Sequence, residues 1–448
     1  MSWSYTVPFV GLLIQLGVGA ASAQEPSPPD AAPQEAQDAP GPEDAEALPA
    51  LEAEIEEELG SSPEEPAPAS GAAGVTPTDL GRVMLLPDVS AALTASIGYY
   101  SDVPTPRLRG HEPDHDRRGL SLQLQELELA IQGVADPYVR ADVFVGFAPD
   151  SAELEQAFVT TLSLPASLQL RAGLLPAEVD RFNTRHYLML EPFADMPLVH
   201  RRFFGGHQLV GIGMEVSWLT PLPWFVEITF EVITADNPVS FGLPASETVG
   251  AKDVLTVGRL EQFFELTDTW SLMVGASAAQ GPNNSGGRRA TASNRTQLAG
   301  GDVMLKWRDL ATVRQLRCIL EYIVRRATVP GGRTIEGGAY LQVDYRLGSH
   351  LEVAARADYF GLPSLLRGEL AFGDVTGAEL LPFLTPSRQW RVGGSVSFYA
   401  SEYHLWRLQY NLDRLLGDDA GLVGRRDPVH EVFLLYQVIL GTHGAHPF

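Results

Sequence analysis

The chain has 448 residues and a formal net charge of −24, with 30 arginines, two lysines (Lys252 and Lys306) and a single cysteine, Cys318. One cysteine excludes an intrachain disulfide, and the acidic balance excludes nucleic-acid binding by charge. After residue 23 there is no run of 18 apolar residues, which excludes membrane-spanning helices.

The N-terminal segment is apolar from Val7 to Ala21, interrupted only by Gln15, and it is followed by the small residues Ser22 and Ala23. This pattern predicts a cleaved signal peptide over residues 1–23, although no lysine or arginine precedes the apolar run. A buried helix or a membrane anchor is the alternative, but the run is short and broken by proline and glycine.

Residues 24–74 hold 14 acidic residues and no lysine or arginine, and most of the remainder is proline and alanine. Such a segment cannot bury enough apolar surface to fold, so we expect an extended, disordered acidic linker. The stretch 45–59 has the spacing of a marginal helix. The rest of the chain, residues 75–448, carries a net charge of −10 and is expected to form one domain.

From residue 86 onward, apolar and polar residues alternate with a period of two. In residues 406–413, Trp406, Leu408, Tyr410 and Leu412 share one face, and polar side chains occupy the other. About 16 segments of this kind predict an all-β fold, a transmembrane antiparallel β-barrel. A soluble sandwich shows the same alternation but rarely has this many strands of this length. The predicted strands are 89–100, 118–132, 138–147, 154–164, 167–174, 208–218, 223–233, 254–265, 268–279, 298–308, 313–325, 334–347, 350–360, 389–400, 402–415 and 430–440.

Three details accompany this pattern. The phase of the alternation slips between residues 120 and 131, which predicts a β-bulge near Gln125 and Glu126. Short turns alternate with long polar loops, as periplasmic turns alternate with extracellular loops. Six tryptophans lie near predicted strand ends, where an aromatic girdle belongs, although scattered core tryptophans are the alternative: Trp218, Trp224, Trp270, Trp307, Trp390 and Trp406.

The connection 175–207 is too apolar to lie in water. We expect it to fold into the lumen, where its polar groups form a pore constriction. Packing between the subunits of a trimer is the alternative. The candidate constriction residues are Arg181, Asn183, Arg185, Arg201 and Arg202.

The inward face of the predicted strands mixes charges of both signs. Arg140 lies near Asp142, and Arg356 lies near Glu352. A mixed wall predicts mild ion selectivity. The candidate lumen-wall arginines are Arg140, Arg171, Arg317, Arg356 and Arg407.

Four segments in order resemble the phosphate-selective porin O and P family: 125–133, 155–159, 168–173 and 182–186, the last reading Phe-Asn-Thr-Arg-His. The resemblance covers about residues 120–235 and the C-terminal strand. It implies a 16-stranded, usually trimeric barrel that conducts anions, with Arg181 and Arg185 beside Asn183 as constriction residues. The chain departs from the family in its mixed lumen charges, where a basic ladder is expected.

Other chemistry is weakly indicated. His111 and His115 in a polar loop, and His443 and His446 near the C-terminus, are residue types that bind metals, but a solvated loop and a strand end explain them equally well. No Gly-x-Ser-x-Gly motif occurs, and the neighbouring pair Ser397 and His404 is of a kind that arises by chance. We therefore predict no enzyme and no cofactor.

The chain ends on an amphipathic strand and a terminal aromatic, Phe448, which resembles the signal that barrel-assembly machinery reads. The combined pattern predicts a diffusion channel, a porin for small hydrophilic solutes or anions such as phosphate. We expect it to lie among the lipids of the outer membrane of a Gram-negative bacterium, with a homotrimer as the possible assembly. The alternative is a non-conducting envelope barrel with a structural or adhesive role.

Overall fold

The computed structural model describes residues 87–101, 119–149, 151–184, 191–206, 208–235, 237, 239–242, 254–283, 294–329, 332–361, 388–416 and 428–441. The chain divides after Val75, and all of these residues belong to the second unit, Thr76–Phe448. Several predicted features lie outside the described residues and stay predictions: the signal peptide, the acidic linker, His111, His115, Arg185, His443, His446 and Phe448.

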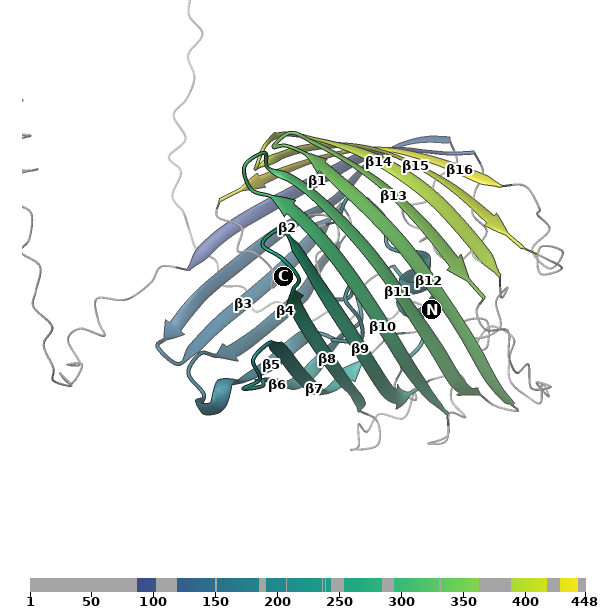
Figure 1. Cartoon of the computed structure of the whole chain (residues 1–448). Coiled ribbons are helices and arrows are strands. Elements are labelled where there is room, and N and C mark those ends of the chain that lie inside the picture. Colours follow the sequence, from purple (N-terminus) through teal and green to yellow (C-terminus); the bar gives the residue numbers. More distant parts are fainter. Residues whose placement is uncertain are drawn as a thin grey trace, which may run out of the picture. The chain divides into compact units, whose positions relative to one another are not determined.

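The described residues form a closed antiparallel barrel of sixteen strands (Figure 1). The barrel closes where the first strand pairs with the last, from Ala91 opposite Leu440 to Tyr100 opposite Glu431. This confirms the predicted fold. The strands are β1 (Asp88–Tyr100), β2 (Gly119–Asp136), β3 (Val139–Ala148), β4 (Ser151–Thr161), β5 (Leu168–Pro176), β6 (Val210–Leu219), β7 (Phe225–Ala235), β8 (Leu255–Glu265), β9 (Trp270–Pro282), β10 (Arg295–Asp309), β11 (Arg314–Val329), β12 (Gly332–Leu347), β13 (Leu351–Phe360), β14 (Gln389–Ser401), β15 (His404–Leu415) and β16 (Val429–Leu440).

The predicted bulge is present between β1 and β2. Thr94 pairs with Glu126 and Ala95 pairs with Leu124, so Gln125 is the extra residue. The bulge restores the inward and outward alternation that the phase slip would otherwise reverse. Strand β10 begins three residues before its predicted start, next to its connection with β9. Strand β11 ends four residues after its predicted end, next to its connection with β12.

The apolar side chains point out of the barrel and the polar ones point in. On β15, Trp406 and Leu408 are 45% and 53% exposed, whereas Arg407 and Gln409 are each 1% exposed. An apolar outer surface around a polar interior is the reverse of a water-soluble sheet, and it is the pattern of a barrel that stands in lipid. Cys318 on β11 belongs to the outward row, between the inward Arg317 and Ile319.

The six tryptophans lie at the rims of the barrel. Five of them flank the short connections at one rim, and Trp390 stands near the start of β14 at the other rim. Each is partly exposed. They therefore occupy the positions of an aromatic girdle and are not core residues.

Among the described residues, two short helices interrupt the strand order: η1 (Pro165–Ser167), between β4 and β5, and α4 (Leu198–Phe204), in the connection between β5 and β6. Within the part of the chain that the structure describes, no helix has the length and apolarity to cross a membrane.

Candidate functional site

The connection between β5 and β6 packs inside the barrel. Its described residues, 177–184, 191–206 and 208–209, are named here the inner loop. Phe203 of α4 lies edge-on to Phe360 of β13, with ring centroids 5.4 Å apart, and both side chains are fully buried. An apolar core therefore fills part of the lumen between the inner loop and the wall; its members include Val179, Leu198, Val199, Phe203, Phe204, Ile233, Val257, Ile319, Ile323, Tyr340 and Phe360.

Asp195 is the main polar anchor of the inner loop. Its carboxylate lies 2.8 Å from a guanidinium nitrogen of Arg356 and 2.8 Å from Nη1 of Arg391. It also accepts hydrogen bonds from Gln409, at 2.5 Å, and from Asn411, at 3.3 Å. One loop side chain thus binds three neighbouring strands, β13, β14 and β15.

Two further loop residues, Glu191 and Leu198, extend this attachment to β11 and β12 and reinforce it on β13. Glu191 pairs with Arg317, at 3.1 Å, and accepts a hydrogen bond from Gln342, at 2.9 Å. The backbone N–H of Leu198, at the start of α4, donates to Asp358, at 2.8 Å. The loop is therefore fixed to the β11–β15 side of the wall by buried charged and polar groups.

Asn183 closes the base of the inner loop. Its amide nitrogen donates to the carbonyls of Ala177 (2.8 Å) and Leu209 (2.9 Å), and its Oδ1 accepts from the N–H of Leu209 (2.7 Å). The side chain is 2% exposed. Asn183 is thus a structural clamp between the two ends of the loop.

A polar cavity of about 450 Å³ lies on the opposite side of the lumen, lined by inward residues of β2 to β8 and by Glu178, Arg181 and Thr184 of the inner loop. Most of its arginines are paired. Arg140 lies 2.7 Å from Asp142, Arg171 binds Glu215 through two nitrogens, and Arg259 lies 3.0 Å from Asp302. Carboxylates and guanidinium groups alternate around the cavity, which gives it a mixed field.

Arg181 differs from these arginines. Its Nη1 and Nη2 lie 2.6 Å and 3.0 Å from the sulfurs of Met273 and Met304, and the residue is 5% exposed. Among the described residues, no carboxylate lies within ion-pair distance of its guanidinium. Because a buried cation without a counter-ion is costly, this group is suited to attract an anion from the cavity.

The structure separates the predicted site residues into two groups. Arg181, Arg140 and Arg171 line the cavity. The others do not line it: Arg202 stacks on Phe360 at 4.4 Å, Arg201 is half-buried on α4, Asn183 is the clamp, and Arg317, Arg356 and Arg407 belong to the opposite wall. The predicted strands mix charges of both signs throughout, so the sequence did not show which arginines line the cavity and which belong to the opposite wall.

Two buried arginines of the barrel wall were not among the predicted site residues. Arg259 and Arg391 are inward arginines of β8 and β14, buried to 6% and 1% exposure. Both lie on the polar face of an alternating strand, so the strand period alone contained the signal for them. Asp195 had no comparable signal, because its partner Arg391 is 196 residues away in the sequence.

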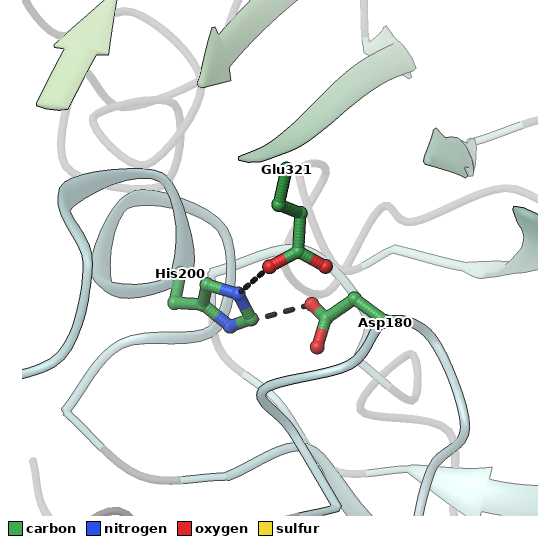
Figure 2. A group of neighbouring side chains, drawn as sticks. All are labelled: Asp180, His200 and Glu321. Atoms are coloured by element: carbon green, nitrogen blue, oxygen red, sulfur yellow. Dashed lines mark hydrogen bonds and ion pairs between the residues drawn. The ribbon is translucent and has the colours of Figure 1, made fainter. Parts of the chain in front are cut away.

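A second buried cluster joins the inner loop to β11. His200 of α4 lies between Asp180 and Glu321 (Figure 2), with Nδ1 3.3 Å from Oδ2 of Asp180 and Nε2 3.2 Å from Oε2 of Glu321. Burial raises the pKa of the Asp180 carboxyl to about 7, although His200 opposes this shift. Burial acts to lower the pKa of His200, but the two carboxylates raise it above its ordinary value.

Ser397 and His404 do not act together. The hydroxyl of Ser397 accepts a hydrogen bond from Nε of Arg407, at 3.0 Å, inside the barrel. His404 lies 2.6 Å from the hydroxyl of Tyr436 through its Nε2. A hydrolytic pair needs a direct contact between serine and histidine, and these two side chains are held by other partners.

Comparisons with known proteins agree with this fold. No family model matches the chain. A protein of Aquifex aeolicus (strain VF5), described only as uncharacterized, is 26% identical over 362 residues, covering 76% of this chain and 72% of that protein. The outer membrane channel DcaP of Acinetobacter baumannii has a similar structure, with a TM-score of 0.51 and 12% identity, over 79% of this chain and 97% of that one. The anion-selective porin from Comamonas acidovorans has a TM-score of 0.50 and 10% identity, over 79% and 99%.

The fold is therefore the 16-stranded barrel of outer-membrane porins and channels. With its apolar outer face and its rim tryptophans, the barrel has the surface of an outer-membrane type of barrel that stands in a lipid bilayer. The resemblance of the sequence to the phosphate-selective porin O and P family stays a prediction.

Proposed function

We propose that the protein is a passive diffusion channel for small hydrophilic solutes. The observation that carries this proposal is the polar cavity of about 450 Å³ between the inner loop and strands β2 to β8. The inner loop packs against the other side of the lumen, so solutes would pass the cavity side. A water-filled path lined by charged groups of both signs admits small polar solutes and excludes apolar ones.

We further propose that the passage has a weak preference for small anions such as phosphate, and that Arg181 provides it. The other cavity arginines are paired with carboxylates, and Glu227 and Glu261 add negative charge. These carboxylates oppose Arg181 and keep the selectivity low. Arginine suits the role because it stays charged when buried and binds oxyanions through two nitrogens.

Planar-bilayer recording of the refolded protein tests the channel. Discrete conductance steps are expected. Their absence would favour the alternative, a non-conducting barrel with a structural or adhesive role in the envelope, with the acidic linker as its contact segment.

The Arg181→Gln variant tests the ion preference. In water, a unit positive charge about 4 Å from a permeating ion stabilises an anion by about 1 kcal/mol and destabilises a cation by about the same amount. Without this charge, the anion-to-cation permeability ratio should therefore fall by up to about 30-fold. Reversal potentials in a salt gradient measure this ratio. Arg326→Gln is the matched control, because Arg326 is exposed on β11. Equal ratios for the two variants would remove Arg181 from the proposal.

Assembly as a homotrimer is also proposed, on the strength of the resemblance in sequence. Chemical cross-linking of the protein in outer-membrane vesicles, followed by electrophoresis without heating, should reveal a trimer band. A monomer band alone would contradict this assembly.

A further inference from the structure

Most carboxylates buried in the barrel wall have an arginine partner. Asp302 lies 3.0 Å from Arg259, and Asp413 lies 2.8 Å from Arg391. Asp180 and Glu321 are different: in the described parts of the chain, no arginine or lysine lies within ion-pair distance of either. Two buried carboxylates therefore share a single histidine, His200, where their counterparts in the wall have an arginine.

The cluster has the residue types and the compactness of a metal site. Asp180, His200 and Glu321 are 1%, 2% and 1% exposed, and each offers one ligand atom such that all three lie within 4.8 Å of one another. They come from three separate elements: the turn after β5, helix α4 and strand β11. Figure 2 shows the carboxylates of Asp180 and Glu321 both directed at the His200 ring.

One oxygen of Asp180 supplies an independent indication. Oδ1 accepts a hydrogen bond from the N–H of Asn183, at 2.7 Å. Oδ2 is fully buried and points into the cluster, 3.3 Å from Nδ1 of His200, but it accepts no hydrogen bond from the described residues. A buried carboxylate oxygen without a hydrogen-bond donor is rare in native proteins, and an ion is one of the standard explanations for it.

The surrounding groups hold the carboxylates in place. The N–H of Arg181 donates to Oε1 of Glu321, at 3.2 Å, and the hydroxyl of Tyr340 also hydrogen-bonds to Glu321. Together with the Asn183 contact, these bonds orient one oxygen of each carboxylate away from the cluster and the other into it. Support of this kind, from outside the ligands, is typical of metal sites.

We propose that Asp180, His200 and Glu321 bind a divalent transition-metal ion of the Zn²⁺ class and that this ion ties the inner loop to β11. One imidazole nitrogen and two carboxylate oxygens are a donor set that Zn²⁺ accepts at about 2.0–2.2 Å. A dication also balances the two carboxylates when the imidazole is neutral. Binding requires the His200 ring to turn, so that one nitrogen faces the ion, and the three ligand atoms to draw closer together than in this structure.

The proposal goes beyond channel function and does not depend on it, so the test uses binding and not conductance. The full-length protein is refolded, stripped with a chelator and dialysed against Zn²⁺, and bound zinc is measured by elemental analysis. Asp180→Asn, His200→Gln and Glu321→Gln keep the size of each side chain. His404→Gln, in a histidine bound to Tyr436 at the barrel rim, is the matched control.

The wild type and the control should each retain one more equivalent of bound zinc than each of the three variants. The zinc affinity of each variant should fall by more than the roughly 10- to 100-fold that removal of a residue outside the ligand set typically causes. Equal zinc content in all five proteins would overturn the site and leave the cluster as an ion pair of protonated His200.

A measurement on the wild type alone covers the case in which a variant does not fold. Co²⁺ in place of Zn²⁺ should give visible absorption bands and a paramagnetically shifted imidazole N–H resonance, and Zn²⁺ should displace both signals. The absence of a shifted imidazole resonance from a Co²⁺-saturated protein would contradict the assignment of His200 as a ligand.

Discussion

Asp195 is the residue on which the polar contacts between the inner loop and the wall converge. Asp195→Asn would leave the guanidinium groups of Arg356 and Arg391 buried with one fewer negative charge between them. Removing one partner of a buried ion pair costs about 3–5 kcal/mol, so the loop should detach more readily. Trypsin digestion of the folded barrel should cleave the variant within the loop much faster than the wild type. Glu402→Gln, in an exposed turn, is the control, and equal cleavage of the two variants would refute the anchoring role.

The stabilisation that Asp195 supplies depends on pH in a defined direction. Burial acts to raise its pKa, but Arg356 and Arg391 outweigh burial and hold the pKa below its ordinary value. A carboxyl with a depressed pKa stabilises the fold above its unfolded pKa, about 3.9, and loses that effect as the pH falls through the folded pKa. The difference in thermal unfolding temperature between the wild type and Asp195→Asn should therefore be constant from about pH 8 to about pH 5. It should shrink only in stronger acid, and a difference that disappeared near pH 6 would contradict this assignment.

At the scale of the element, helix α4 is held by packing. Phe203 is fully buried, meets the ring of Phe360 edge-on and lies under the guanidinium of Arg325, 4.8 Å from its ring centroid. Truncation of a buried phenylalanine costs about 3–5 kcal/mol. Phe203→Ala should therefore lower the unfolding temperature in detergent and loosen the inner loop. Phe398→Ala, on the outer face of β14, removes the same volume and should leave the protection of the loop from trypsin unchanged.

The elements differ in how far the sequence predicts them. Each strand, and the bulge at Gln125, follows from the local alternation of apolar and polar residues, because that alternation fixes which face each side chain occupies. The apolar character of the inner loop also indicated burial. Its partners were not predictable, because contacts such as Asp195 with Arg391 depend on how the loop crosses the lumen, and no local pattern encodes that path. For the same reason, the cluster of Asp180, His200 and Glu321 appeared only in the structure.

At the scale of the whole molecule, the barrel is defined by its apolar outer surface between two rims. On β12, Leu341 is 48% exposed near the middle of this surface, and Leu347 is 46% exposed at the strand end beside a short turn. Both leucines point outward, so they differ mainly in their expected depth in a bilayer. The rim tryptophans mark the interface level, since Trp307 of β10 pairs with Leu316, which pairs with Tyr345 of β12.

This arrangement predicts that the cost of an outward charge depends on depth. Leu341→Arg should destabilise the barrel in lipid vesicles by about 2–4 kcal/mol, whereas Leu347→Arg should cost about 0–1 kcal/mol, because an arginine at the interface reaches water. Denaturant unfolding of the two variants, reconstituted in the same vesicles, measures the difference. A soluble sheet would show no such gradient, because both positions would face water. Equal costs at Leu341 and Leu347 would therefore mean that the apolar surface does not stand in a bilayer.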